Sequence, residues 1–178
     1  MHRFSPILAN LLAIFVSTQA LNGATAHPTA PTLLQLTQKS GYIFTGVVLS
    51  VERAARKAAN QVEAVQIQFQ VEQAIRGVSA KQVFTVREWM GLWQAGERYQ
   101  PGERVLLFLY PTSKLGLTSP VWGPFGRFQL DANGQVLVNQ VRLIALRTGL
   151  PHKPPVKGRA SSVSALDLAR AIRRVGEQ

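Results

Sequence analysis

The side chains that most often bind metals or transfer protons are scarce in this chain. The sequence has no cysteine and three histidines, and only His27 and His152 follow the N-terminal leader described below. Without thiolates, a structural zinc site is not expected. If the leader were cleaved after Ala26, the new terminal amine and the imidazole of His27 could chelate copper, with His152 as a third nitrogen ligand. We expect instead that both histidines lie in irregular segments and form no copper site. Copper sites need ligands that the surrounding structure holds rigidly, which irregular segments do not provide.

The acidic residues lack the spacing of a catalytic site. Asp131 stands in a turn sequence and Asp167 near a helix start, so no Ser–His–Asp triad can be assembled around His152. A carboxylate pair like that of a glycosidase would have to come from Glu52, Glu63, Glu72 and Glu88. All four are expected on polar strand faces or at strand ends, where carboxylates face water. We therefore predict a protein that is not an enzyme and uses no cofactor, with an unrecognised hydrolase as the alternative.

Aromatic residues gather in two segments that also carry arginine. The first is WMGLWQAGERY, residues 89–99, and the second is the glycine- and proline-rich KLGLTSPVWGPFG, residues 114–126. The candidate ligand-binding residues are Trp89, Trp93, Tyr99, Trp122 and Phe125, with Arg87, Arg98 and Arg127 as a cationic rim. Aromatic loops of this kind can form a platform for a glycan, a peptide or another protein. The alternative is that the rings plug one end of the fold and pack against a short N-terminal helix.

The N-terminus has the composition of a secretory signal peptide. Arg3 supplies a positive charge, residues 7–16 form an apolar stretch, and Ala24-Thr25-Ala26 is an A-x-A cleavage site, with Ala20 as a second possible site. The apolar stretch is about half the roughly 20 residues that a membrane-spanning helix needs. We therefore predict a signal peptide over residues 1–26, no transmembrane segment in the mature protein, and a periplasmic or secreted location.

Charge restricts the partners of the exported chain. A formal charge of +11 in 178 residues favours anionic partners in the cell envelope, such as lipid head groups, acidic glycans or cell-wall polymers. Nucleic acid is not expected outside the cytoplasm. The basic tail from Arg142 to Arg174 could bind an anionic surface; the alternative is a solvated linker followed by a helix docked on the domain.

Periodicity predicts a sheet with one helix at each end of the chain. Residues 32–37 read as a short helix that ends at Gly41, and strands are expected over 43–52, 65–71, 82–89 and 105–110. In the second strand, apolar and polar residues alternate from Val65 to Glu72, which is typical of a sheet with one buried face. The unbroken apolar run at 105–110 predicts a strand buried on both faces. A hairpin follows around residues 131–134, and a helix over 165–175 is expected to begin with a capping box formed by Ser164 and Asp167.

These elements predict a mainly β protein, with a small antiparallel barrel of five or six strands and an amphipathic C-terminal helix. We expect a barrel domain over residues 27–148, a basic proline-rich linker over 149–162 and the C-terminal helix within 163–178. A closed or nearly closed barrel is favoured because closure hides strand edges.

The order of these segments resembles a known family. IFTGVVLSVE, VQIQFQVEQAIRG, FTVREW and PGERVLLFLY, within residues 42–130, resemble the netrin-like modules of the tissue inhibitors of metalloproteinases and similar exported bacterial proteins. The resemblance implies a barrel of the oligonucleotide/oligosaccharide-binding type. Those inhibitors chelate the protease zinc through an N-terminal cysteine, which this chain lacks, so their mechanism does not transfer. The predicted function is an exported, non-catalytic binding or accessory module, with a protease inhibitor or accessory factor and a copper-binding protein as alternatives.

Overall fold

A computed structural model describes residues 30–54, 62–96, 98–138, 140–147 and 163–176 of the chain. The predicted signal peptide, the proline-rich linker and the two candidate copper ligands, His27 and His152, lie outside the described residues. None of the described helices is long and apolar enough to cross a membrane.

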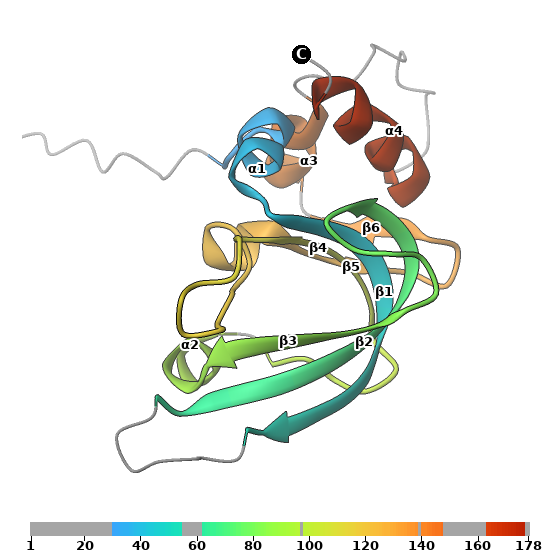
Figure 1. The fold of residues 1–178 in the computed structure, drawn as a ribbon. Helices are drawn as coiled ribbons and strands as arrows, with labels where there is room; N and C mark the ends of the chain where they lie inside the picture. The colour runs from blue at the N-terminus through green and yellow to red at the C-terminus, as the bar shows by residue number, and fades with distance from the viewer. Residues whose placement is uncertain (1–29, 55–61, 97, 139, 148–162, 177–178) are drawn as a thin grey trace, which may run out of the picture.

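The described strands form one antiparallel sheet that is strongly curled (Figure 1). The strands are β1 (Tyr42–Arg53), β2 (Ala64–Arg76), β3 (Val83–Trp89), β4 (Arg104–Leu109), β5 (Arg127–Leu130), β6 (Gln135–Leu137) and β7 (Val163–Ser164). Their order across the sheet is β3-β2-β1-β4-β5-β6-β7. The mainly β, antiparallel architecture is confirmed, but the prediction of five or six strands is wrong because residues 163–164 add a short strand to β6.

The prediction of a closed or nearly closed barrel is also wrong. β3 and β7 are the two ends of the described sheet, and no ladder joins them. The open side of β3 is met by the segment after β4, where the backbone N–H of Thr118 donates to the carbonyl of Arg87 at 2.9 Å. A loop thus protects this strand edge, which removes the need for strand-to-strand closure.

The curl of the sheet originates in β1. This strand pairs with β2 along its length and with β4 only over residues 42–47, and three register shifts interrupt its ladder with β2. Such bulges bend a strand and increase its twist. Gly46 lies at one of them, and a Cβ at this position would lie 2.6 Å from the carbonyl oxygen of Gln70. The close approach of the β2 backbone therefore leaves no room for a side chain at this position.

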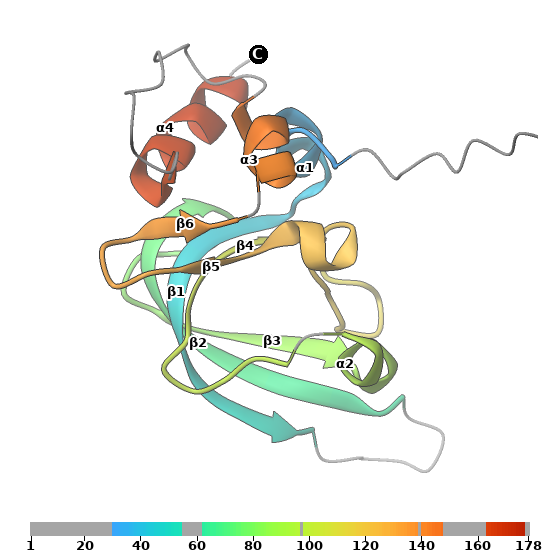
Figure 2. The same ribbon diagram turned by 180° about the vertical axis from the view of Figure 1, so that it is seen from behind.

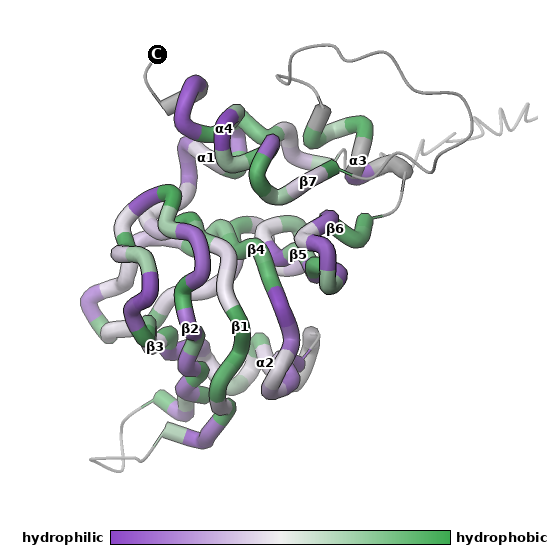
Figure 3. Tube along the Cα trace, turned by 90° about the vertical axis from the view of Figure 1, so that its right-hand side faces the viewer, coloured by the Kyte–Doolittle hydropathy of each residue, from purple (hydrophilic) through white to green (hydrophobic). Residues whose placement is uncertain are grey.

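Strands at the centre of the sheet are buried on both faces. Leu106 and Phe108 of β4 point toward the helices, whereas Val105, Leu107 and Leu109 point into the curl of the sheet. The expectation of a doubly buried strand here is confirmed. β2 is buried on one face only, as its alternation predicts, and this alternation is visible along the strand in Figure 3.

Three helices cover one face of the sheet (Figures 1 and 2). They are α1 (Leu33–Lys39), α3 (Gln140–Arg147) and α4 (Ala165–Gly176). α1 begins with a capping box in which Thr32 and Gln35 exchange hydrogen bonds.

Ser164 directly precedes α4, as the sequence predicts. Its hydroxyl accepts a hydrogen bond from the backbone N–H of Leu166 at 3.1 Å, which satisfies one of the free donors at the start of the helix. The Asp167 carboxylate pairs with Arg170 at 3.3 Å on the surface of the helix. Ser164 therefore caps the beginning of α4, but Asp167 bonds to Arg170 and does not complete the predicted capping box.

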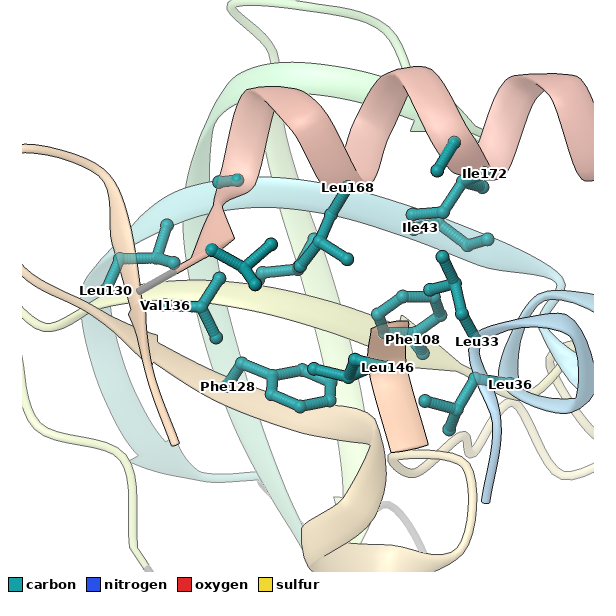
Figure 4. Packing of buried hydrophobic residues seen from close by; sticks show 14 of the residues in the cluster. Leu33, Leu36, Ile43, Phe108, Phe128, Leu130, Val136, Leu146, Leu168 and Ile172 are labelled. Carbon is teal, nitrogen blue, oxygen red and sulfur yellow. The ribbon is translucent and has the colours of Figure 1, made fainter. Parts of the chain in front are cut away.

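α4 packs against the sheet and α1 through its apolar side. Leu168 and Ile172 are buried and point from α4 toward Ile43, Phe108 and Leu33 (Figure 4). The helix is therefore packed on the domain.

Three short helical segments are not predicted by the sequence pattern. They are α3, α2 (Met90–Ala95) and the 3-10 helix η1 (Gly123–Gly126). α3 contributes Leu146 to the same buried cluster that holds α1 and α4 against the sheet.

The hairpin between β5 and β6 is confirmed. The Asp131 carboxylate accepts hydrogen bonds from the backbone N–H groups of Asn133 and Gln135 at 2.8 and 2.7 Å. Gly134 adopts a positive φ of 71°, which closes the turn. Asp131 therefore has the turn role expected from the sequence.

Candidate binding surface at the open side of the sheet

Side chains at the end of β3 alternate between the interior and the surface. Val86 and Glu88 are buried on the inner face, while Thr85 and Trp89 are exposed on the outer face. Because side chains alternate along a strand, Glu88 must follow Val86 into the interior. The expectation that Glu88 lies on a water-facing surface is therefore wrong: its exposed fraction is 5%.

Tyr99 is the centre of a buried polar and aromatic cluster inside the curl. Its hydroxyl donates a hydrogen bond to Oε1 of Glu88 at 3.2 Å, and the residue is 3% exposed. Phe69 meets the Tyr99 ring edge-on with centroids 5.5 Å apart, and the centroid of Trp93 lies 5.8 Å away. The guanidinium carbon of Arg127 lies 4.0 Å from the centroid of the Tyr99 ring. Three predicted site residues, Trp93, Tyr99 and Arg127, are thus brought together.

Arg127 forms a nearly buried ion pair. Its Nη2 lies 2.8 Å from Oε1 and 2.9 Å from Oε2 of Glu103, and the two side chains are 6% and 12% exposed. The same nitrogen donates to the carbonyl of Arg98 at 3.2 Å. Glu103 also accepts hydrogen bonds from the Gln129 amide and the backbone N–H of Gln100. Arg127 therefore lies inside the molecule and does not form part of an exposed cationic rim.

Burial changes the ionisation of this cluster. Removal from water raises the pKa of Glu88 to about 7 from an ordinary 4.5, while the Tyr99 hydrogen bond and the positive charge of Arg127 act in the opposite direction. Burial, and then the negative charge of Glu88, raise the pKa of Tyr99 well above its ordinary value. Tyr99 therefore keeps its proton and remains the donor to Glu88.

The cluster contains groups that could transfer a proton, but they are bonded to one another. A carboxyl group with a pKa near 7 has the ionisation of a general acid or base. Its hydrogen-bond partner is Tyr99, and the second carboxylate, that of Glu103, is held by Arg127 and Gln129. Within the described part of the chain, no group of three or more His, Asp or Glu side chains could hold a metal ion.

Several large apolar side chains are exposed at the end of β3, on α2 and on the segment between β4 and η1. Trp89 is 51% exposed and Leu92 45% exposed at the start of α2, while Leu115 and Trp122 are 67% and 39% exposed in the segment between β4 and η1. We call these four residues the apolar rim. The Trp89 ring lies directly over Gly91, where a Cβ would be 2.5 Å from a ring carbon.

The segment after β4 links the two parts of the apolar rim. Tyr110 and Ser119 are joined by a backbone hydrogen bond of 3.0 Å, and Thr118 bonds to Arg87 of β3. A Cβ on Gly116 would lie 3.5 Å from Nη1 of Arg87, so the turn that carries Leu115 passes beside this arginine. Arg87 is half-buried and Arg98 is exposed, which leaves two cations of the predicted rim at the surface.

Trp122 has an unusual backbone. Its φ of 52° and ψ of 38° lie in the left-handed region, which costs a residue other than glycine about 1–2 kcal/mol. Its N–H donates to the hydroxyl of Tyr110 at 3.3 Å, which helps to hold this conformation. A strained backbone beneath an exposed tryptophan is typical of functional sites.

Phe125 belongs to a different part of the molecule. The guanidinium of Arg142 lies over the rings of Phe125 and Phe128, and it donates hydrogen bonds to the carbonyl groups of Pro124, Phe125 and Arg127. Together with Leu36 of α1, Phe125 lines a small depression between the helices and the sheet. The packing of an aromatic ring near the N-terminal helix, one of the two alternatives, is thus observed for Phe125.

The sequence interpretation therefore groups residues that the structure separates. Trp93, Tyr99 and Arg127 lie in or against the interior, Trp89 and Trp122 are exposed, and Phe125 lies at the helical layer.

Two members of the buried cluster, Glu88 and Glu103, are absent from the predicted site. A signal for Glu88 exists, because Phe84, Val86 and Glu88 share one strand face. No comparable signal exists for Glu103, because its partner Arg127 lies 24 residues away in the chain.

Comparison with known proteins gives no match to a family model, to a curated protein or to a solved structure. The resemblance to netrin-like modules therefore stays a prediction.

Proposed function

We propose that this protein is an exported, non-catalytic binding module that recognises an acidic glycan of the cell envelope through the apolar rim. The observation that carries the proposal is the exposure of Trp89 and Trp122, at 51% and 39%, on segments tied together through Thr118 and Arg87. Exposed apolar groups that gather on one part of a small protein are typical of interaction sites.

The chemistry of the rim favours a sugar with negative charge. Sugar rings present apolar C–H faces that can lie against indole rings. The carboxylates of acidic glycans are attracted to Arg87, on the same strand face as Trp89, and to the exposed Arg98. The strained backbone at Trp122 supports a functional role, since such strain persists where the surrounding structure maintains it.

The buried cluster supports the non-catalytic part of the proposal. Glu88 is covered and bonded to Tyr99, and Glu103 is bonded to Arg127, so these carboxyl groups hold the loop that follows α2 against the sheet. This arrangement keeps the apolar rim in place.

Binding of acidic envelope glycans, compared with neutral glycans of the same length, tests the proposal. We expect the double variant Trp89→Ala/Trp122→Gly to lose at least about 2 kcal/mol of binding free energy, as aromatic hot-spot residues do, which is about thirtyfold in Kd. Glycine adopts the left-handed conformation at position 122 without strain. This relief of strain partly offsets the stability that is lost when the tryptophan ring is removed.

The matched control is Leu49→Ala/Leu137→Ala, which removes two leucines that are 44% and 54% exposed on β1 and β6. This variant should bind as the unmodified protein does, by isothermal titration calorimetry. Equal losses in both variants, or equal binding of neutral and acidic glycans, would contradict the proposal.

A further inference from the structure

The helical layer has a different charge balance from the sheet. By sequence, α1, α3 and α4 together carry six Lys or Arg residues and one acidic residue, Asp167. The chain from Tyr42 to Leu137, which contains β1 to β6, carries ten basic and seven acidic residues. Positive charge is therefore concentrated on the side of the molecule where the helices lie (Figures 1 and 2).

Among the side chains that the structure describes in the helical layer, those on the exposed side of α4 carry most of the accessible positive charge. Its buried residues Leu168 and Ile172 face the core, so the other side of the helix faces water. That side presents Leu166, Asp167, Arg170, Arg173 and Arg174, all of them exposed. We call these residues the basic face of α4.

The contacts of these arginines leave them available at the surface. Arg170 pairs with Asp167 at 3.3 Å, but the two side chains are 60% and 63% exposed, so water screens the pair. Arg173 reaches the carbonyl of Ala74 at 3.3 Å while its side chain remains exposed. Arg142, by contrast, is engaged with the carbonyls around η1 and contributes little to this face.

The composition of the layer selects among anionic partners. α1, α3 and α4 contain no Trp, Tyr or Phe, so they offer no rings on which bases or sugars could stack. They do present exposed leucines, Leu34 on α1 at 43% and Leu166 on α4 at 48%. Arginines beside exposed aliphatic side chains suit a lipid surface, where the charges meet head groups and the aliphatic groups enter the interface.

We propose that the basic face of α4 binds anionic phospholipid head groups and so attaches the domain to a membrane surface. This surface is separate from α2, which carries Leu92 of the apolar rim and lies on the other side of the molecule (Figure 1). Attachment through α4 leaves α2 and the end of β3 accessible to a separate partner.

Co-sedimentation of the full chain with lipid vesicles tests the proposal. Phosphatidylcholine vesicles that contain phosphatidylglycerol are compared with pure phosphatidylcholine vesicles, which report any contribution of the apolar leader. We expect binding to the anionic vesicles that weakens with salt, and a loss of about fivefold for each arginine removed in Arg170→Gln/Arg174→Gln.

Two further variants separate a specific face from net charge and from misfolding. Arg53→Gln/Lys114→Gln removes two exposed charges from the sheet side and should leave binding almost unchanged. Asp167→Asn removes the one carboxylate of the basic face and should strengthen binding, which a folding defect cannot do. Equal losses in the two double variants would overturn the proposal, as would binding to an acidic glycan such as heparin with no binding to anionic vesicles.

Discussion

The carboxyl group of Glu88 is buried away from water. We therefore predict that the folding stability of the protein depends on pH. Burial raises the pKa of Glu88 to about 7, above the ordinary value of 4.5, so the folded state favours the protonated form. The contribution of Glu88 to the free energy of unfolding is fully present at pH values below 4.5, and it is lost as the pH rises from there through about 7. The loss amounts to about 3 kcal/mol when the carboxyl group is fully ionised.

We therefore expect Glu88→Gln to remove this loss. The free energy of unfolding of the variant, relative to that of the unmodified protein, should increase by about 3 kcal/mol between acidic and mildly alkaline pH. Urea denaturation at the two pH values measures this difference. Val86→Ala, a buried change on the same strand face without a titrating group, is the control and should cost the same at both pH values. A relative stability of Glu88→Gln that does not change with pH would contradict the prediction.

Arg127 and Glu103 should behave as a buried pair in which each charge depends on the other. Arg127→Met leaves the Glu103 carboxylate, 12% exposed, without its main partner, and we expect a loss of about 3–5 kcal/mol in the free energy of unfolding. Glu103→Gln in the same protein removes the isolated charge and should restore part of this loss.

A double-mutant cycle followed by chemical denaturation measures the coupling between the two residues. The exposed pair of Arg104 and Glu72, with side chains 35% and 33% exposed, provides a matched cycle. It should give a coupling of less than about 1 kcal/mol. Additive effects of Arg127→Met and Glu103→Gln would show that the buried pair contributes no specific stabilisation.

At the same scale, the sequence predicts residue environments only where a local pattern decides them. Strand alternation places Val65, Ile67 and Phe69 in the interior, and the same rule applied to β3 places Glu88 beside them. The burial of Arg127 depends on Glu103 and Tyr99, which precede it by more than 20 residues. No pattern within β5 reveals that contact.

At the scale of elements, α4 is a short helix whose stability depends on its docked face. Helices of this length are marginal in water unless tertiary contacts cover their apolar side. Leu168 is fully buried among residues of the sheet and of α1, so we expect Leu168→Ala to cost about 2–5 kcal/mol in the free energy of unfolding.

Leu166→Ala is the matched control, because Leu166 lies on the same helix and is 48% exposed. Its cost should be within about 0.5 kcal/mol, as is usual for surface substitutions. Thermal or urea denaturation measures both variants. Equal, small effects of the two substitutions would show that α4 is not docked in solution.

The elements that can be predicted are those with a clear period. β2 alternates along its length, β4 is apolar at all but its first residue and α4 repeats its apolar residues at helical spacing, so each is recognisable in the sequence. α2 has six residues and α3 has eight, which is too short for a period to emerge. Both helices depend on contacts with the rest of the molecule, through Met90 of α2 and Leu146 of α3, and this dependence on tertiary structure is invisible in the sequence.

At the scale of the whole molecule, the open sheet illustrates a limit of prediction from sequence. Strand number and order determine how far a sheet curls, but whether its ends meet depends on competition between a strand ladder and other chain segments. Here the segment after β4 reaches β3 through Thr118 and Arg87, and the interior behind it is filled by Tyr99, Arg127 and Glu88. Those contacts join segments far apart in the chain.

The same arrangement explains how two binding surfaces can coexist on a small domain. β1 and β4 contribute side chains to both buried clusters, the one beneath the helices and the one inside the curl. The basic face of α4 lies over the first of these clusters, whereas α2, which carries Leu92 of the apolar rim, packs on the second through Met90. A ligand on one surface need not move the other, because close-packed strands between them resist small displacements. The two proposed activities should accordingly be separable by substitution, with the variants of each surface retaining the binding of the other.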